Sequence, residues 1–151
     1  MQRLRQRAAD LQLRNLVFLP PVPMTEVGRY LAAADALLVH LRKDPLFEIT
    51  IPSKTQAYMA VGKPLLMAVD GDAADLVRQS GGGVVAESEN AQALADAAER
   101  MAALGVDALP EMGRKAQAYY QQHLALSAGT RRFGAVFQRL ARGDQASGSR
   151  P

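Results

Sequence analysis

Four short apolar runs punctuate the first part of the chain, and stretches with helical spacing separate them. The runs occupy residues 16–19, 36–40, 64–69 and 84–86. Apolar runs of this length between helices are typical of strands buried on both faces, as found in parallel sheets. Strands that alternate with helices form such a sheet with a helical layer on either side. The sequence therefore predicts an α/β fold built on a doubly wound parallel sheet.

The segments between and after these runs carry apolar residues at spacings of three and four, which predicts helices packed on the sheet. The first predicted helix covers residues 2–12. Four further helices are expected to begin at the caps Thr25, Ser53, Asp72 (with Asp75 in the capping-box position) and Asn90. Two more are predicted over 109–124 and 128–141. No strand separates the last three helices, so we expect them to pack as a layer or an arm. Residues 142–151 are small and polar, and they predict a flexible tail after a domain of residues 1–141.

The composition excludes several kinds of site. The chain has 151 residues, of which 48% are hydrophobic and 22% charged, as in ordinary globular proteins. Cysteine is absent, which rules out disulfides and thiolate chemistry. The histidines His40 and His123 are far apart in the sequence, so we expect no metal site. Aromatic residues make up only 5% of the chain, which argues against a stacking platform for nucleic acid bases.

The charge is mildly basic, with 18 lysines and arginines against 15 acidic residues and a net charge of +3. Arginines gather toward both ends of the sequence: Arg3, Arg5, Arg7, Arg14, Arg131, Arg132, Arg139, Arg142 and Arg150. They indicate either solvated helix faces or attraction to anionic lipid headgroups or phosphates. No apolar run is long enough to cross a bilayer, and the first residues lack a signal-peptide pattern, so a cytoplasmic setting is expected.

Residues 49–64 contain the most informative local pattern. Pro52 keeps the residue before it extended, Ser53 is placed to cap a helix with Gln56 at the capping-box position, and Gly62 is placed to end it. Such a box occupies two amides and leaves those of Lys54 and Thr55 free at the positive end of the helix dipole. A helix end of this kind binds phosphate, and the Lys54 ammonium lies beside it. The alternative interpretation is a well-capped helix with a solvated lysine.

Three other features have a functional and a structural interpretation. His40 ends an apolar run, where ligands gather in parallel sheets, but a lone histidine there also fits the rim of a core. Tyr58 and Met59 lie on the inward face of the same helix and are interpreted as core residues. The glycines at 81–83 lack the strand-to-helix context of a phosphate loop, so they predict a turn.

Taken together, these motifs resemble the C-terminal, nucleotide-sugar-binding domain of family-four retaining glycosyltransferases, which have the two-domain GT-B architecture. The resemblance covers residues 4–140, approximately. Residues 15–19 resemble the family's N-V-x-F strand, and 30–38 its Y-x-x-A-D-x-x-L element. Residues 47–58, 64–68, 71–77 and 89–97 resemble later motifs of the same domain. Among its members, the chain is most similar to bacterial surface-polysaccharide enzymes such as the O-antigen and capsule L-fucosamine transferases.

The resemblance implies a Rossmann-like domain that binds a nucleotide-diphosphate sugar, with a UDP-linked amino sugar favoured as the donor. The implied reaction transfers the sugar, with retention, to a lipid-linked saccharide acceptor at the inner face of the cytoplasmic membrane. Neither a metal nor a cofactor is implied, because the protein supplies the positive charge at the diphosphate. The site residues expected from the residues and the resemblance together are Ser53, Lys54, Thr55, Glu48, Gln56 and His40. No catalytic residue is assigned.

The sequence departs from the family in two respects. The family's pair of glutamates would fall on Ile49 and Ala57, so Glu48 or Gln56 would have to replace them at the ribose. The family's N-terminal acceptor domain and the first two strands of its C-terminal domain have no counterpart here. In the strand order 3-2-1-4-5-6 those two strands are central, so runs 16–19 and 36–40 are not expected to be neighbours. We therefore expect an incomplete domain with exposed apolar edges. The chain would be a fragment, would need a partner chain, or would repack to close the gap.

Three alternatives to this function remain open at the level of sequence. The chain could be a noncatalytic donor-binding subunit that pairs with a separate acceptor-domain chain. It could be a nucleotide-sugar epimerase, for which His40, Asp44 and Glu48 are the acid–base candidates. A flavodoxin-like regulatory domain would require an acidic cluster after the early strands, whereas the first two runs end at Pro20 and His40.

Overall fold

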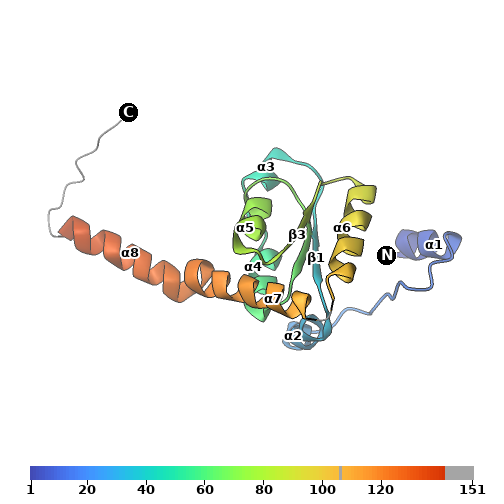
Figure 1. Cartoon of the computed structure of the whole chain (residues 1–151), viewed down its shortest axis with the longest axis horizontal. Helices are drawn as coiled ribbons and strands as arrows, with labels where there is room; N and C mark the ends of the chain where they lie inside the picture. Colours follow the sequence, from blue (N-terminus) through green and yellow to red (C-terminus); the bar gives the residue numbers. More distant parts are fainter. Residues whose placement is uncertain (106, 142–151) are drawn as a thin grey trace.

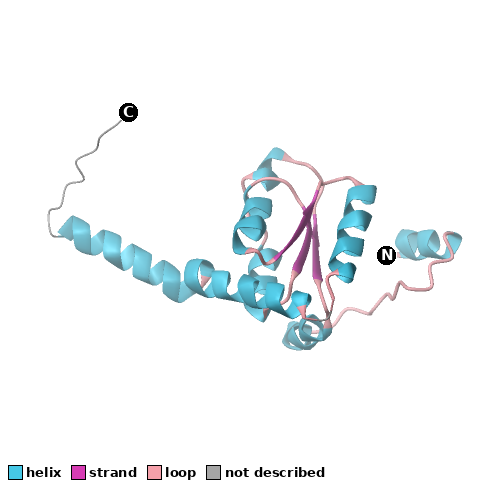
Figure 2. Cartoon of the chain, in the orientation of Figure 1, coloured by secondary structure: helices cyan, strands magenta, loops and turns pink. Residues whose placement is uncertain are grey.

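A computed structural model describes residues 1–105 and 107–141 and contains one parallel sheet of three strands. The strands are β1 (Leu37–His40), β2 (Leu65–Ala68) and β3 (Gly83–Ala86), in the order β1-β2-β3 (Figures 1 and 2). Residue Leu65 of β2 stands opposite Leu37 on one side and Gly83 on the other. The α/β class and the parallel sheet predicted from the sequence are confirmed.

Helices cover both faces of this sheet. The helices of the sheet region are α2 (Met24–Ala33), α3 (Pro45–Glu48), α4 (Ser53–Val61), α5 (Asp72–Ser80), α6 (Ala91–Ala103) and α7 (Ala108–Tyr119). In Figure 1, α6 lies against one face, and α4, α5 and α7 lie against the other. The chain is therefore doubly wound in its described part, as the alternation of runs and helices predicted.

Alternation of side chains along the strands divides the core into two clusters. Leu65 and Met67 point with Val39 into the cluster beneath α4, α5 and α7, where Met59 is fully buried. The intervening residues of β2 and β3 point the other way, into a smaller cluster around Ala97 of α6. Because β2 has both neighbours and both helical layers, it is the most buried strand.

The prediction of a strand at residues 16–19 is wrong. These residues run as an extended loop, and Leu16, Val17 and Leu19 are exposed. An apolar run forms a buried strand only where a neighbouring strand offers its backbone, and in the described sheet β1 pairs with β2 alone. Because residues 16–19 form no strand, the expectation that runs 16–19 and 36–40 would not be neighbours in the intact sheet stays a prediction.

Three predicted side-chain caps are also wrong, and for one reason. The N-cap positions of α2, α4 and α5 are taken by Pro23, Pro52 and Gly71, and no side-chain hydrogen bond caps these described helices. Thr25, Ser53 and Asp72 therefore lie inside the first turn instead of before it. Because a proline or glycine takes the N-cap position, the cap lies one or two residues earlier than predicted.

Three other helix ends agree with the sequence. The Asn90 side chain accepts a hydrogen bond of 2.9 Å from the Ala93 N–H, which caps α6 as predicted. Gly62 ends α4 in the left-handed conformation, with φ of 76°. Gly81 ends α5 in the same way, so the predicted turn is confirmed at residues 81 and 82, whereas Gly83 already belongs to β3. Glycine adopts this conformation at little cost, which is why it is common after helices.

The C-terminal part forms an arm. Helix α7 continues into a π-helical turn, η1 (Tyr120–Leu124), and then into α8 (Leu126–Ala141). Whereas α7 packs on α4 and α5, α8 contacts η1 and extends away from the sheet (Figure 1). The helices predicted over 109–124 and 128–141 are thus present, with a break at 125. The tail predicted for residues 142–151 lies outside the described residues.

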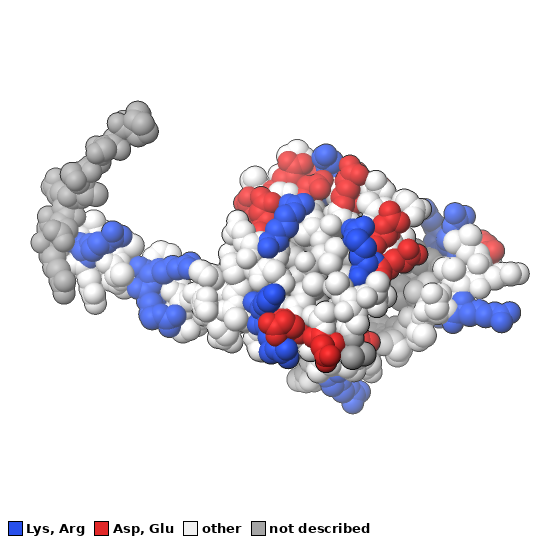
Figure 3. All heavy atoms as spheres, in the orientation of Figure 1, with Lys and Arg blue, Asp and Glu red and all other residues white. Residues whose placement is uncertain are grey.

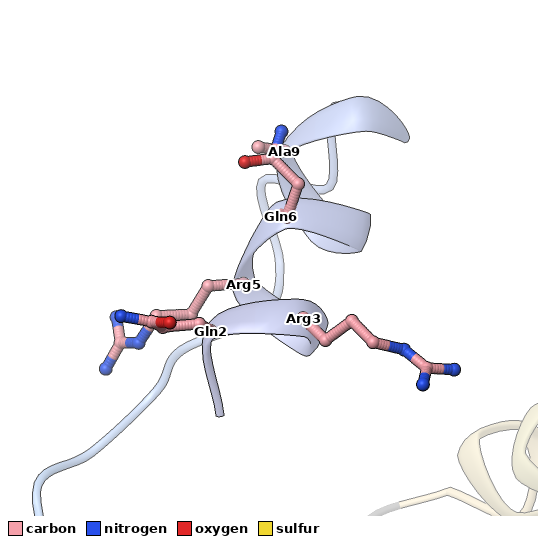
Figure 4. A pocket seen from close by; sticks show the side chains of 5 residues that line it. All are labelled: Gln2, Arg3, Arg5, Gln6 and Ala9. Carbon is pink, nitrogen blue, oxygen red and sulfur yellow. The ribbon is translucent and has the colours of Figure 1, made fainter.

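Helix α1 (Gln2–Asp10) stands apart at the other end of the molecule (Figure 1). Its side chains are mostly exposed: Ala8 is its one buried residue, and Leu4 and Leu11, which helical spacing places on the same face, are exposed. Figure 4 shows Arg3 pointing away from Gln2 and Arg5. The Arg5 guanidinium lies 4.8 Å from the centre of the Phe18 ring, a cation–π contact with the extended loop. Among residues 1–105 and 107–141, every helix is too short or too polar to span a bilayer.

The exposure of the extended loop gives a stability prediction. We expect Val17→Asp to change the free energy of unfolding by less than about 0.5 kcal/mol, because the side chain already faces solvent. The matched change Val39→Asp puts an unpaired charge into the core of β1, and we expect it to cost about 4 kcal/mol or more. Urea denaturation followed by circular dichroism measures both. A large loss for Val17→Asp would show that residues 16–19 are buried after all.

Candidate functional site

The strands all end at one edge of the sheet, and a hollow of about 400 Å³ lies there beside β1. In open α/β sheets, ligands bind outside the carboxyl ends of the strands. The hollow is lined by the end of β1, the loop after it and the start of α4: Leu38, Val39, His40, Leu41, Phe47, Thr50, Pro52, Ser53 and Lys54. It is therefore placed where the fold would hold a ligand.

Three of the predicted site residues meet at this hollow. His40 is the last residue of β1, and Ser53 and Lys54 are the first residues of α4. All three are exposed. Among the lining residues there is one lysine and no carboxylate, so the charged group facing the hollow is cationic. An exposed cation at a helix start suits an anionic ligand.

The start of α4 differs in detail from the predicted capping box. The Thr55 N–H donates to the Pro52 carbonyl at 2.9 Å, so it is not free as predicted. Ser53 follows the cap, and its amide and that of Lys54 belong to the first turn, whose N–H groups have no carbonyl partner within the helix. The positive helix end is thus present, but its available amides are those of residues 53 and 54.

The other predicted site residues do not line the hollow. Thr55 is fully buried, and within the described part of the chain its hydroxyl has no hydrogen-bond partner. Gln56 is half-buried one residue further along α4. Glu48 is half-buried at the end of α3. Ligand contacts by Thr55, Gln56 and Glu48 stay predictions, and each would require a ligand that reaches beyond the hollow.

A short helix in the loop after β1 was missed from the sequence. The Asp44 side chain accepts a hydrogen bond of 2.9 Å from the Leu46 N–H and caps α3, which has Pro45 in its first turn. An acidic cap followed by proline is a usual helix start, so the signal was present in the sequence. This turn places Phe47 in the wall of the hollow.

A polar cluster that sequence reasoning also missed ties the strand ends together. The Ser88 hydroxyl donates to the Asp70 carboxylate at 2.5 Å, which links the loop after β3 to the loop after β2. Lys43, in the loop after β1, has its ammonium 4.0 Å from the same carboxylate. These residues are separated widely in the sequence, and only the parallel strands bring them to one edge. In Figure 3, acidic and basic side chains are mixed along this upper edge.

The loop after β1 is also fixed by a close backbone contact. Gly71, with φ of 77°, begins α5, and a Cβ atom there would overlap the Glu48 carbonyl oxygen. Only glycine allows the two segments to approach so closely. The carbonyl end of α3, and with it one wall of the hollow, is thereby held against α5.

A metal-ligand cluster is not seen in this region. Residues 1–105 and 107–141 contain no group of three or more histidine, aspartate or glutamate side chains that could hold a metal ion. Lys54 and the start of α4 are positive groups that the described residues place at the hollow.

Known proteins resemble both the sequence and the fold. The family model "Glycosyl transferases group 1" matches residues 1–103. Among solved structures, sucrose-phosphate synthase from Thermosynechococcus elongatus superposes with a TM-score of 0.72 at 19% sequence identity. The superposition covers 94% of this chain and 34% of that chain, so this chain spans about a third of the synthase. A search of curated protein sequences finds no match.

If the close contact between Gly71 and Glu48 holds the loop after β1 in place, a larger residue at position 71 should loosen that loop. We expect Gly71→Ala to lower the free energy of unfolding by about 2 kcal/mol or more, since the backbone conformation is one that glycine alone adopts readily and the new Cβ meets a carbonyl. Limited proteolysis should then cut more readily within residues 44–52.

The matched control is Gly81→Ala. Its φ is also positive, 61°, but the nearest atom to a new Cβ is the flexible Lys115 Cδ at 3.5 Å. We expect a loss of only about 1 kcal/mol and unchanged cleavage within 44–52. Equal cleavage in both variants would show that the Gly71 contact does not hold the loop.

Proposed function

The chain belongs to the group 1 glycosyl transferases and has the fold of a Rossmann-like GT-B domain, and we propose that it binds the nucleotide-sugar donor for glycosyl transfer. The observation that carries the proposal is the hollow at the end of β1, where Lys54 and the start of α4 face the same space. The family match covers this entire region, since it includes residues 1–103.

The proposed donor is a nucleotide-diphosphate sugar whose diphosphate lies against the start of α4. The Lys54 ammonium and the amides of Ser53 and Lys54 are the donors of positive charge and hydrogen bonds. As the bond from the sugar to the diphosphate breaks, negative charge grows on the leaving oxygen. Groups already fixed around that oxygen stabilise the transition state more than the ground state, which lowers the barrier.

The remaining groups of the hollow suit the rest of such a donor. His40 can donate to or accept from a hydroxyl or a phosphate oxygen, and Phe47 and Leu38 offer apolar surface. Glu48 and Gln56 flank this region, and either could bind the ribose if the donor extends past the hollow. We propose a UDP-linked amino sugar as the donor and retention at the anomeric carbon, on the resemblance of the motifs.

The proposed acceptor is a lipid-linked saccharide used in surface polysaccharide synthesis at the inner face of the cytoplasmic membrane. Acceptor and catalytic groups would come from a second domain or a partner chain. Exposed apolar surface supports the presence of such a second domain or partner chain. Leu38 is half-exposed on the uncovered side of β1, and the apolar residues of loop 16–19 are exposed. Surfaces of this kind are usually covered by further polypeptide.

The same surfaces support a second candidate, a noncatalytic donor-binding subunit that works with a separate acceptor-domain chain. An assay of sugar transfer by this chain with and without the polypeptide of an adjacent reading frame separates the two candidates. A nucleotide-sugar epimerase is less well supported, because Asp44 is engaged in capping α3 and pairs with Arg42 at 3.7 Å. Analysis of products formed from the donor alone would detect epimerisation.

The proposed role of Lys54 predicts a specific loss of donor binding. We expect Lys54→Ala to weaken UDP binding by about 10-fold to 100-fold, because a hydrogen bond to a charged group contributes about 1.5–3 kcal/mol. Isothermal titration calorimetry of the full chain measures the effect. The melting temperature should not change, since the Lys54 side chain is exposed.

Lys115→Ala is the matched control, since Lys115 is an exposed lysine on α7 that does not line the hollow. Its affinity for UDP should equal that of the unchanged chain. The proposal is refuted if UDP binds with the same affinity to Lys54→Ala, or if both variants weaken binding equally.

A further inference from the structure

Phe47 contributes the one phenyl ring among the residues that line the hollow at the end of β1. The residue is half-buried, yet neither of the two core clusters of the described residues includes it. Three tyrosines, in contrast, pack against the larger cluster: Tyr58, Tyr119 and Tyr120. The position of Phe47 is therefore not explained by filling the core, and its ring forms part of the wall of the hollow instead.

The short helix α3 holds this ring in a fixed position at the edge where the strands end (Figure 1). The Asp44 carboxylate accepts a hydrogen bond from the Leu46 N–H at 2.9 Å, and the Asp44 carbonyl accepts one from the Phe47 N–H at 2.9 Å. After the helix, the Thr50 hydroxyl donates to the Leu46 carbonyl. The turn is thus tied on both sides of Phe47. A ring that is already fixed loses little conformational freedom when a ligand packs on it.

The hollow combines this ring with a cation. Phe47 comes from α3, whereas Ser53 and Lys54 come from the start of α4, and all three line the same space of about 400 Å³. Leu38 and Leu41 add apolar surface to it. Binding pockets of this kind orient a ligand through a few polar groups and bury its apolar part against the rest of the wall. The ligand that matches both kinds of group has an anionic end and a ring with an apolar face.

A sugar in the six-membered pyranose form has such a face. Its hydroxyls project mostly around the rim, while C–H bonds lie on the two faces of the ring. A face rich in C–H bonds packs well on an aromatic side chain, which offers a large apolar surface with a negative centre. Which C–H bonds a face presents depends on whether each hydroxyl is axial or equatorial. A fixed aromatic ring can therefore distinguish two sugars that differ at one carbon.

We propose that Phe47 recognises the sugar of the nucleotide-sugar donor by packing against the apolar face of its ring. The inference rests on the proposed function, in which the diphosphate lies at Ser53 and Lys54. In that binding mode the ribose lies past the hollow, near Glu48 or Gln56, so the sugar is the ring that remains inside it. Phe47 then selects the donor by the configuration of its sugar, while Lys54 binds the part that all such donors share.

Isothermal titration calorimetry of the full chain tests this division. The probes are UDP, UDP-N-acetylglucosamine and UDP-N-acetylgalactosamine, whose sugars differ only in configuration at C4. We expect Phe47→Ala to weaken binding of the preferred UDP-sugar by about 3-fold to 10-fold, the range of an aromatic contact, and to bring the two UDP-sugars closer in affinity. Binding of UDP should not change. Equal weakening for UDP and both UDP-sugars, or no change for any probe, would overturn the proposal.

Leu46→Ala is the matched control, since Leu46 is the neighbour of Phe47 on α3, is 62% exposed and does not line the hollow. Its affinities for the three probes should equal those of the unchanged chain. The conservative change Phe47→Tyr keeps the ring, so it should keep the preference between the two UDP-sugars. If Leu46→Ala loses that preference, or if Phe47→Tyr loses it as Phe47→Ala does, the effect comes from the fold of the loop and the proposal fails.

A fluorescent reporter at the same position separates the sugar from the base. The chain has no tryptophan, so Phe47→Trp places a single indole in the wall of the hollow. We expect the tryptophan emission to change when the preferred UDP-sugar is added and to stay the same with UDP. An equal change with UDP would show that the base or ribose lies on this ring, which would refute the assignment of the sugar to Phe47.

Failure of this inference is distinguishable from failure of the proposed function. If UDP binds the unchanged chain and Lys54→Ala weakens that binding, the donor site stands whatever Phe47→Ala does to the sugar preference. If neither UDP nor the UDP-sugars bind the unchanged chain, the proposed function itself fails, and the role of Phe47 fails with it.

Discussion

The burial of β2 on both faces and at both edges is the constraint on which the rest of the structure depends. Leu65 and Met67 point into the cluster under α4, α5 and α7, while Leu66 and Ala68 face the smaller cluster under α6. Every described strand–strand pairing includes β2. Since burial of apolar surface is the main stabilising contribution, β2 fixes where β1 and β3 end. Those ends in turn place His40, Asp70 and Ser88 at one edge.

Close contacts that only small residues permit set the loops and helices around this centre. Gly113 of α7 lies so close to Gly62 that a Cβ would meet the Gly62 carbonyl, and Gly82 lies in the same way against Ala116. The Gln117 side chain donates to the Ala60 carbonyl at 3.0 Å, which joins α7 to α4 again. These contacts hold the C-terminal end of α4 against α7, while Pro52 precedes its start, where the proposed diphosphate contacts lie. A fixed helix end is what electrostatic stabilisation of a leaving group requires.

Three surfaces of the chain remain apolar and uncovered in its described part: the free side of β1, the loop at residues 16–19 and the face of α8 that carries Phe133, Phe137 and Leu140. The backbone N–H groups of Leu37 and Leu41 donate to carbonyls of the β2 segment. The backbone N–H and C=O groups of Leu38 and His40 therefore point to the free edge of the sheet. Each surface has a different chemistry. The β1 edge offers backbone hydrogen bonds, as a strand would require, whereas α8 offers apolar side chains and arginines.

The sequence by itself determined the fold class, the three strands β1, β2 and β3, the position of α4 and the glycine ends at Gly62 and Gly81. These follow from local rules, because apolar periodicity and glycine conformation depend on neighbours in the chain. Whether residues 16–19 formed a strand could not be decided locally, since a strand requires a neighbouring backbone to pair with, and these residues pair with no strand of the described sheet even though one edge of β1 is free. The caps at Ser53, Asp72 and Thr25 were misplaced because Pro52, Gly71 and Pro23 already held the helix entries. Only the tertiary structure brought His40 beside Ser53 and Lys54, or joined Ser88 and Lys43 around Asp70, because parallel strands bring distant segments to one edge.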